Sequence, residues 1–76
     1  MAITSDLDDG IENLRAVGLS NREIRVWVIA EVVDYNANPN PHPMTIDGLN
    51  NFLTPRGLLP ALTGNPNDIV KEPVAP

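Results

Sequence analysis

The sequence predicts an all-α fold, a small three-helix arrangement with a proline-rich loop and an extended C-terminal arm. Residues 20–35 hold the densest apolar run and open with a helix-start signal. Two further segments, 5–17 and 45–53, carry apolar residues at helical spacing. Prolines at alternate positions in the loop, and again near the C-terminus, exclude helices there. We therefore expect a compact helical domain at 1–63 and an arm at 64–76.

Length and composition limit both the core and the partners. The chain has 76 residues, and a domain of this size buries only about 60% of its unfolded surface. It has no cysteine and a single histidine, His42, so a disulfide framework and an ordinary zinc site are excluded. A net charge of −5 argues against a surface that neutralises phosphates. We expect no metal, no cofactor and no nucleic-acid partner.

The distribution of apolar residues also bears on location. No apolar run approaches the roughly 18 residues of a membrane-spanning helix. The first ten residues, MAITSDLDDG, lack the basic and hydrophobic regions of a secretory signal. We expect no membrane contact, and a place in the cytoplasm or within a virion-type assembly.

Residues 5–17 predict the first helix, with Ser5 or Asp6 as its N-cap and Gly18 as its end. Its apolar face is expected to consist of Leu7, Ile11, Leu14 and Val17. Several carboxylates crowd the start of this helix, where the helix dipole favours negative charge. Their spacing does not match a calcium-binding loop, because position 12 counted from Asp6 is a valine rather than a glutamate.

Residues 20–35 predict the central helix. Ser20 and Glu23 have the spacing of a capping box, and Leu19 and Ile24 that of a hydrophobic staple. The alternative is a strand, since β-branched residues alternate with other residues through this stretch. We favour the helix because the run is longer than the usual 4 to 8 residues of a strand.

The central helix would carry two apolar stripes. One consists of Ile24, Val28, Val32 and Tyr35, and the other of Val26, Ile29, Ala30 and Val33. The neighbouring helices can cover the first stripe fully and the second only in part, and uncovered apolar surface often marks a contact site. The alternative is that Leu58, Leu59 and Leu62 fold back and cover the second stripe.

The rest of the chain supplies a spacer and a third helix. Prolines 39, 41 and 43 favour an extended connection. Thr45 is a suitable N-cap for a helix whose apolar face holds Ile46, Leu49, Phe52 and Leu53. Thr54 and Pro55 predict one further turn, and Gly57 limits its length.

One short stretch resembles a known motif. Residues 18–24 read GLSNREI, which is similar to the opening of the helix-turn-helix in response-regulator DNA-binding domains. The resemblance covers seven residues and implies a DNA-binding protein. The sequence then departs from the pattern, because residues 25–35 contain neither a turn nor a basic recognition helix.

Residues suited to catalysis are sparse. A nucleophile needs a base within reach, and the one histidine lies between two prolines of the loop. No glycine is followed by the Lys-Ser or Lys-Thr pair of a phosphate-binding loop. We predict that the chain is not an enzyme.

These observations favour a non-catalytic protein–protein interaction subunit, an accessory or structural part of a larger oligomeric assembly. By analogy with arm-bearing shell proteins, we expect a virion component. The alternatives are a small acidic inhibitor that blocks a basic or nucleic-acid-binding surface of its target, and a helix-turn-helix DNA-binding protein. Trp27 is the predicted anchor, because interface hot spots favour tryptophan. The other predicted contact residues are Glu23, Glu31, Asp34, Val26, Ile29 and Val33, with Ile69, Val70 and Val74 in the arm.

Overall fold

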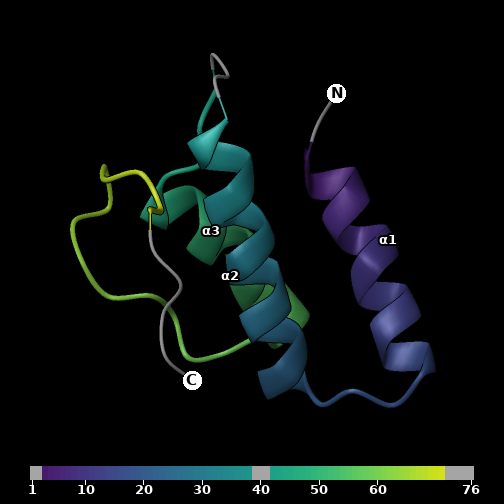
Figure 1. The fold of residues 1–76 in the computed structure, drawn as a ribbon. Coiled ribbons are helices and arrows are strands. Elements are labelled where there is room, and N and C mark those ends of the chain that lie inside the picture. Colours follow the sequence, from purple (N-terminus) through teal and green to yellow (C-terminus); the bar gives the residue numbers. More distant parts are fainter. Residues whose placement is uncertain (1–2, 39–41, 72–76) are drawn as a thin grey trace.

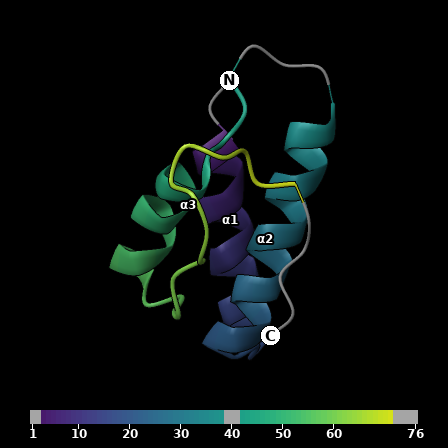
Figure 2. The same cartoon turned by 90° about the vertical axis from the view of Figure 1, so that its left-hand side faces the viewer.

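The computed structural model describes residues 3–38 and 42–71, and within these ranges it is all-α, as predicted. It contains helices α1 (Ile3–Ala16), α2 (Asn21–Ala37) and α3 (Ile46–Leu53), followed by the short 3₁₀ helix η1 (Thr54–Arg56). Helices α1 and α2 run antiparallel side by side, and α3 packs behind them (Figures 1 and 2). The rest of the described chain is an extended segment that crosses back over α3 toward α2 (Figure 2).

The predicted capping box sets the start of α2. The Ser20 hydroxyl accepts a hydrogen bond from the Glu23 backbone N–H at 3.2 Å, and the Glu23 carboxylate accepts one from the Ser20 backbone N–H at 2.9 Å. That backbone hydrogen bond lowers the pKa of Glu23. The helix then runs without interruption for 17 residues, which rules out the strand alternative. It also passes straight through the position where a helix-turn-helix would turn.

The hairpin between α1 and α2 follows from Gly18. This glycine has a φ of +95°, and its N–H and that of Leu19 donate to carbonyls of the last turn of α1. Because α1 begins at Ile3 and ends at Ala16, both ends lie earlier than predicted. The expected inward position of Val17 was wrong, since Val17 lies beyond the helix and is 73% exposed.

A single core draws on all three helices and on the segment after them. Its buried apolar residues are Leu7, Ile11, Ile24, Val28, Ile29, Val32, Leu49, Phe52, Leu53, Leu58, Leu62 and Val70. Two of the three leucines after α3, Leu58 and Leu62, therefore do fold back, whereas Leu59 is exposed. The second stripe of α2 is accordingly divided: Ile29 is buried, Val26 and Val33 are half-buried and Ala30 is exposed.

The segment after residue 64 is extended, but as far as Lys71 it packs on its own domain. The Ile46 N–H donates to the Asp68 carbonyl at 2.8 Å, and the Val70 N–H donates to the Met44 carbonyl at 3.1 Å. Val70 is 4% exposed and belongs to the core, so it is not free to bind a neighbour in this conformation. The core thus extends past the predicted boundary at residue 63. Residues 72–76, including Val74, lie outside the described residues.

Two asparagine side chains hold this non-helical segment in place. The Asn36 amide nitrogen donates to the carbonyls of Met44 and Val70, both at 2.9 Å, and its amide oxygen accepts from the Met44 N–H at 2.8 Å. Asn50 makes a matching pair of hydrogen bonds with the backbone of Leu62, at 2.8 and 3.1 Å. These hydrogen bonds leave Asn50 half-buried.

Arg25 is the buried charged residue of the core, at 5% exposure. Its Nε donates to the Pro60 carbonyl at 2.8 Å, which ties the segment between Leu58 and Leu62 to α2. No buried side-chain nitrogen or oxygen lacks a hydrogen-bond partner anywhere in residues 3–38 and 42–71.

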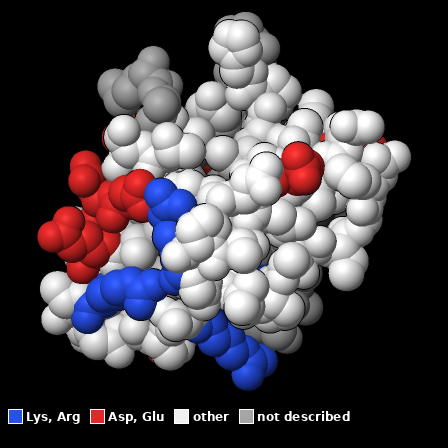
Figure 3. Space-filling view, turned by 180° about the vertical axis from the view of Figure 1, so that it is seen from behind, with Lys and Arg blue, Asp and Glu red and all other residues white. Residues whose placement is uncertain are grey.

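An ion pair joins α1 to η1. Arg56 donates from Nε and Nη2 to the two carboxylate oxygens of Asp8, at 2.7 and 2.9 Å. The same guanidinium lies over the Phe52 ring, 3.7 Å from its centroid, and donates to the Phe52 carbonyl. Figure 3 shows acidic side chains gathered at one edge of the molecule with basic side chains beside them, while much of that face carries neither.

We predict that Asp8→Asn destabilises the chain at neutral pH and has no effect in strong acid. The Arg56 hydrogen bonds lower the pKa of Asp8 below its ordinary value of 3.8. A lowered folded-state pKa adds stability above the unfolded-state value, and that stability is lost as the pH falls through the folded-state pKa. Asp8 is 49% exposed, so solvent limits the loss at pH 7 to about 0.5–1 kcal/mol.

The measurement is urea unfolding of both chains at pH 7 and at about pH 2, where the difference should vanish. Asp9→Asn is the matched control, because the neighbouring Asp9 is exposed and forms no ion pair with any described residue. Equal losses in the two variants would assign the effect to net charge rather than to the Arg56 pair.

Candidate functional site

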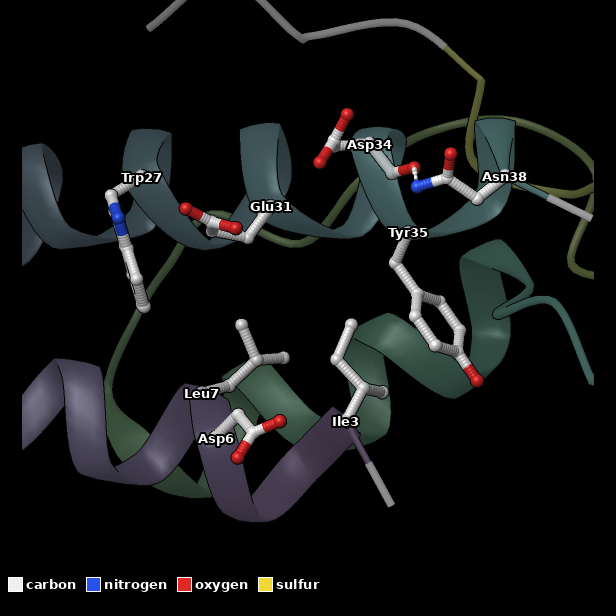
Figure 4. A pocket seen from close by; sticks show the side chains of 8 residues that line it. All are labelled: Ile3, Asp6, Leu7, Trp27, Glu31, Asp34, Tyr35 and Asn38. Carbon is white, nitrogen blue, oxygen red and sulfur yellow. Dashed lines mark hydrogen bonds between the residues drawn. The ribbon is translucent and has the colours of Figure 1, made fainter. Parts of the chain in front are cut away.

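Six of the ten predicted contact residues line two grooves that share α2. The larger, which we call the acidic groove, lies between α1 and α2 and has a volume of about 320 Å³ (Figure 4). It contains three of the predicted residues, Trp27, Glu31 and Asp34. Its other lining residues are Ile3, Asp6, Leu7, Tyr35 and Asn38.

Helical spacing arranges the lining of the acidic groove. One face of α2 carries three groove residues on successive turns, Trp27, Glu31 and Tyr35. Figure 4 shows Trp27 pointing toward α1 at one end of the groove and the Tyr35 ring at the other end, with Glu31 between them. The Tyr35 hydroxyl donates to the His42 carbonyl at 3.3 Å. Ile3 and Leu7, one turn apart on α1, point back toward α2 and form an apolar floor.

Gly10 of α1 positions the Trp27 ring. A Cβ atom at Gly10 would lie 2.8 Å from Cζ2 and 2.9 Å from Cζ3 of the indole, and closer still to Cη2. The six-membered ring of the indole, nearest at Cη2, therefore occupies the space that a side chain at Gly10 would take. Trp27 is half-buried and packs against the core, so core contacts fix the position of its indole at one end of the groove.

The carboxylates of the acidic groove form no ion pair with a cation of the described residues. Asp6, Glu31 and Asp34 are exposed, and no arginine or lysine in the described ranges forms an ion pair with any of them. Figure 4 shows the Asp34 carboxylate directed away from α1, at the outer rim, while its backbone carbonyl accepts from Asn38 at 3.1 Å. An apolar and aromatic floor with an acidic rim can hold a group that is part apolar and part cationic.

The second groove, which we call the C-terminal groove, lies between α2 and the segment 69–71. It has a volume of about 190 Å³ and is lined by Val33, Asn36, Ala37, Ile69, Val70 and Lys71. It therefore gathers three further predicted residues, of which Val33 is half-buried, Ile69 is exposed and Val70 is buried. It carries a single charged side chain, so it offers less to define a ligand.

Three described residues of the predicted set lie in neither groove. Glu23 is occupied in the capping box, Ile29 is buried in the core, and Val26 is half-buried beside it. The prediction missed Asp6, Leu7 and Tyr35 as groove residues. Tyr35 could have been found, because it continues the spacing of Trp27 and Glu31 by one turn, but the sequence pattern did not specify which residues of α1 face it.

The described residues hold no group of three or more His, Cys, Asp or Glu that could bind a metal ion. None of the helices is long and apolar enough to cross a membrane, over the part of the chain that the structure describes. Comparison of the chain with protein-family models, with curated proteins and with solved structures finds no match in any of the three.

Proposed function

We propose that the chain is a non-catalytic interaction subunit that binds a partner protein through the acidic groove. The observation that carries this proposal is the position of Trp27 at one end of an open groove whose carboxylates have no ion-pair partner within the described residues. Tryptophan is enriched among the residues that dominate the binding energy of protein interfaces, and it contributes most where the partner completes its burial. Its fixed position on Gly10 adds preorganisation, which reduces the entropy lost on binding.

The role of such a subunit has two versions. In the first, the chain is a structural or accessory part of a larger assembly, and a virion component remains the narrower prediction. In the second, it is an acidic inhibitor, which the unpaired carboxylates of the groove and the net charge of −5 favour. An assembly part should occur in many copies in a complex, whereas an inhibitor should bind one basic target at a fixed ratio.

Photo-crosslinking from the rim of the groove tests the proposal. A photoreactive residue is placed at Asp34 in cells that produce the protein, and at Glu12 as the control, since Glu12 is an exposed acidic residue of α1 outside the groove. We expect a protein adduct from position 34 and none, or much less, from position 12. The crosslinked protein is then purified and titrated with the unmodified chain.

The titration decides whether the groove is the contact. Glu31→Lys should weaken binding by about tenfold or more, whereas Glu12→Lys, which changes the net charge equally, should weaken it by less than about threefold. Equal crosslinking from both positions, or equal losses of affinity in both variants, would overturn the proposal. The mass of the purified complex then separates the assembly role from the inhibitor role.

A further inference from the structure

We propose that the occupant of the acidic groove is an arginine side chain of the partner protein, with its guanidinium stacked on Trp27 and paired with Glu31. This inference rests on the proposed function and specifies the chemistry of the partner. It is drawn from the arrangement of the groove and from a second site in the same fold, where an arginine of the chain itself already lies between a carboxylate and an aromatic ring.

The filled site is Arg56. Its guanidinium forms two hydrogen bonds with the Asp8 carboxylate and lies over the Phe52 ring, 3.7 Å from the centroid. It therefore has a carboxylate at its edge and an aromatic ring on its face, the two surfaces that a planar guanidinium matches. The acidic groove presents the same two surfaces, the Trp27 ring and the Glu31 carboxylate one helical turn away, with no arginine from the described residues between them.

The charge of the groove selects a cation over other ligands. Asp6, Glu31 and Asp34 would repel an acidic segment or a phosphate, and an uncharged apolar side chain would desolvate them without compensation. The attraction is strongest for a cation placed beside Glu31, between the two aromatic rings, and Asp34 at the outer rim adds a longer-range attraction. Charge complementarity thus predicts that the partner residue in the groove is positively charged.

The apolar floor and the aromatic ring select arginine over lysine. The methylenes of an arginine can lie over Ile3 and Leu7, while its planar head stacks on an indole and donates a fork of two hydrogen bonds to one carboxylate. A lysine ammonium is a compact, strongly hydrated charge and gains less from the ring. A volume of about 320 Å³ admits one such side chain with its neighbouring backbone.

The test is a titration of the purified chain with acetyl-Leu-Arg-Leu-amide, followed by Trp27 fluorescence and by the indole N–H signal in NMR. The chain has one tryptophan, so both signals report this groove alone. The matched peptide carries citrulline, which keeps the shape of arginine and removes its charge. We expect a dissociation constant on the order of 1 mM for the arginine peptide, as is usual for a small ligand in an open site. The citrulline peptide should bind about tenfold or more weakly.

Protein variants locate the charge. Glu31→Gln should weaken the arginine peptide about tenfold, and Glu12→Gln, with the same net charge, should leave it within about twofold. Equal binding of the two peptides, equal losses in the two variants, or no change at Trp27 with 10 mM peptide would each overturn the inference. A Trp27 signal that depends on protein concentration without peptide would show that a second copy fills the groove, and would also overturn it.

The result is separable from that of the crosslinking experiment. If a partner crosslinks from Asp34 and depends on Glu31, but the arginine and citrulline peptides bind equally, the proposed function stands and the arginine assignment fails. If no partner crosslinks while the arginine peptide binds selectively, the chemistry of the groove stands and its use in a protein complex fails.

Discussion

Val28→Asp is expected to unfold the chain at 25 °C, whereas Val33→Asp should leave it folded. Val28 is 0% exposed and lies in the core between the other helices. A carboxylate placed there is buried among apolar side chains, and the Nε–H of the buried Arg25, one turn away, already donates to the Pro60 carbonyl. Burial of a poorly paired charge costs several kcal/mol, in addition to the lost apolar contacts. A small domain has a total stability of roughly 5–15 kcal/mol, and one of this size lies near the lower end.

The control is sensitive because the two positions are chemically alike. Val33 is half-buried on the same helix and lines the C-terminal groove, so a carboxylate there can reach solvent. Far-ultraviolet circular dichroism with a thermal scan measures both variants. A folded Val28→Asp chain would contradict the arrangement of the core around α2, and an unfolded Val33→Asp chain would show that this groove is closed in solution.

Gly10→Ala is expected to destabilise the chain by about 1–3 kcal/mol, the range for overpacking of a closely packed site. The sign is the opposite of the one that helix propensity predicts, because alanine is favoured over glycine inside a helix by about 1 kcal/mol. The cause is the Trp27 ring, whose carbons Cζ2 and Cζ3 lie 2.8 and 2.9 Å from the position of the new methyl group. The ring would have to move outward and lose its packing on α1.

A second background isolates that cause. In a Trp27→Leu chain the ring is absent, so Gly10→Ala should there be neutral or stabilising by up to about 1 kcal/mol. Urea unfolding of the four chains gives the coupling energy between the two positions. If Gly10→Ala has the same effect on stability in both backgrounds, the Trp27 ring is not the reason why alanine is unfavourable at position 10.

Local signals in the sequence predicted the helices well. The Ser20–Glu23 capping box, the Thr45 N-cap and the positive φ of Gly18 are all present, because each depends on residues within one turn of the chain. The same locality explains the pairing of Trp27 with Glu31 on one face of α2. The floor supplied by α1 depends on how two helices pack, which the sequence pattern alone did not specify.

Apart from the ends of α1 and the position of Val17, the features that the sequence did not predict are contacts between distant residues. Arg25 is a charged residue within the apolar run of α2, and it is buried because the Pro60 carbonyl, 35 positions away, accepts its Nε–H. Val70 was assigned to a free arm, and it is buried because Asn36, 34 positions earlier, binds its carbonyl. Polar side chains that bond to loop backbone leave no periodic signal, so neither contact was visible before the structure.

Asn36 has a consequence for the way the fold opens. One amide group joins the chain on both sides of α3, at Met44 and at Val70. Release of either segment leaves the half-buried Asn36 amide with fewer partners, which makes release of the other less costly. The two segments therefore form one cooperative unit, and amide protons at Ile46 and Val70 should exchange with solvent together, in local openings that leave the antiparallel pair α1 and α2 intact.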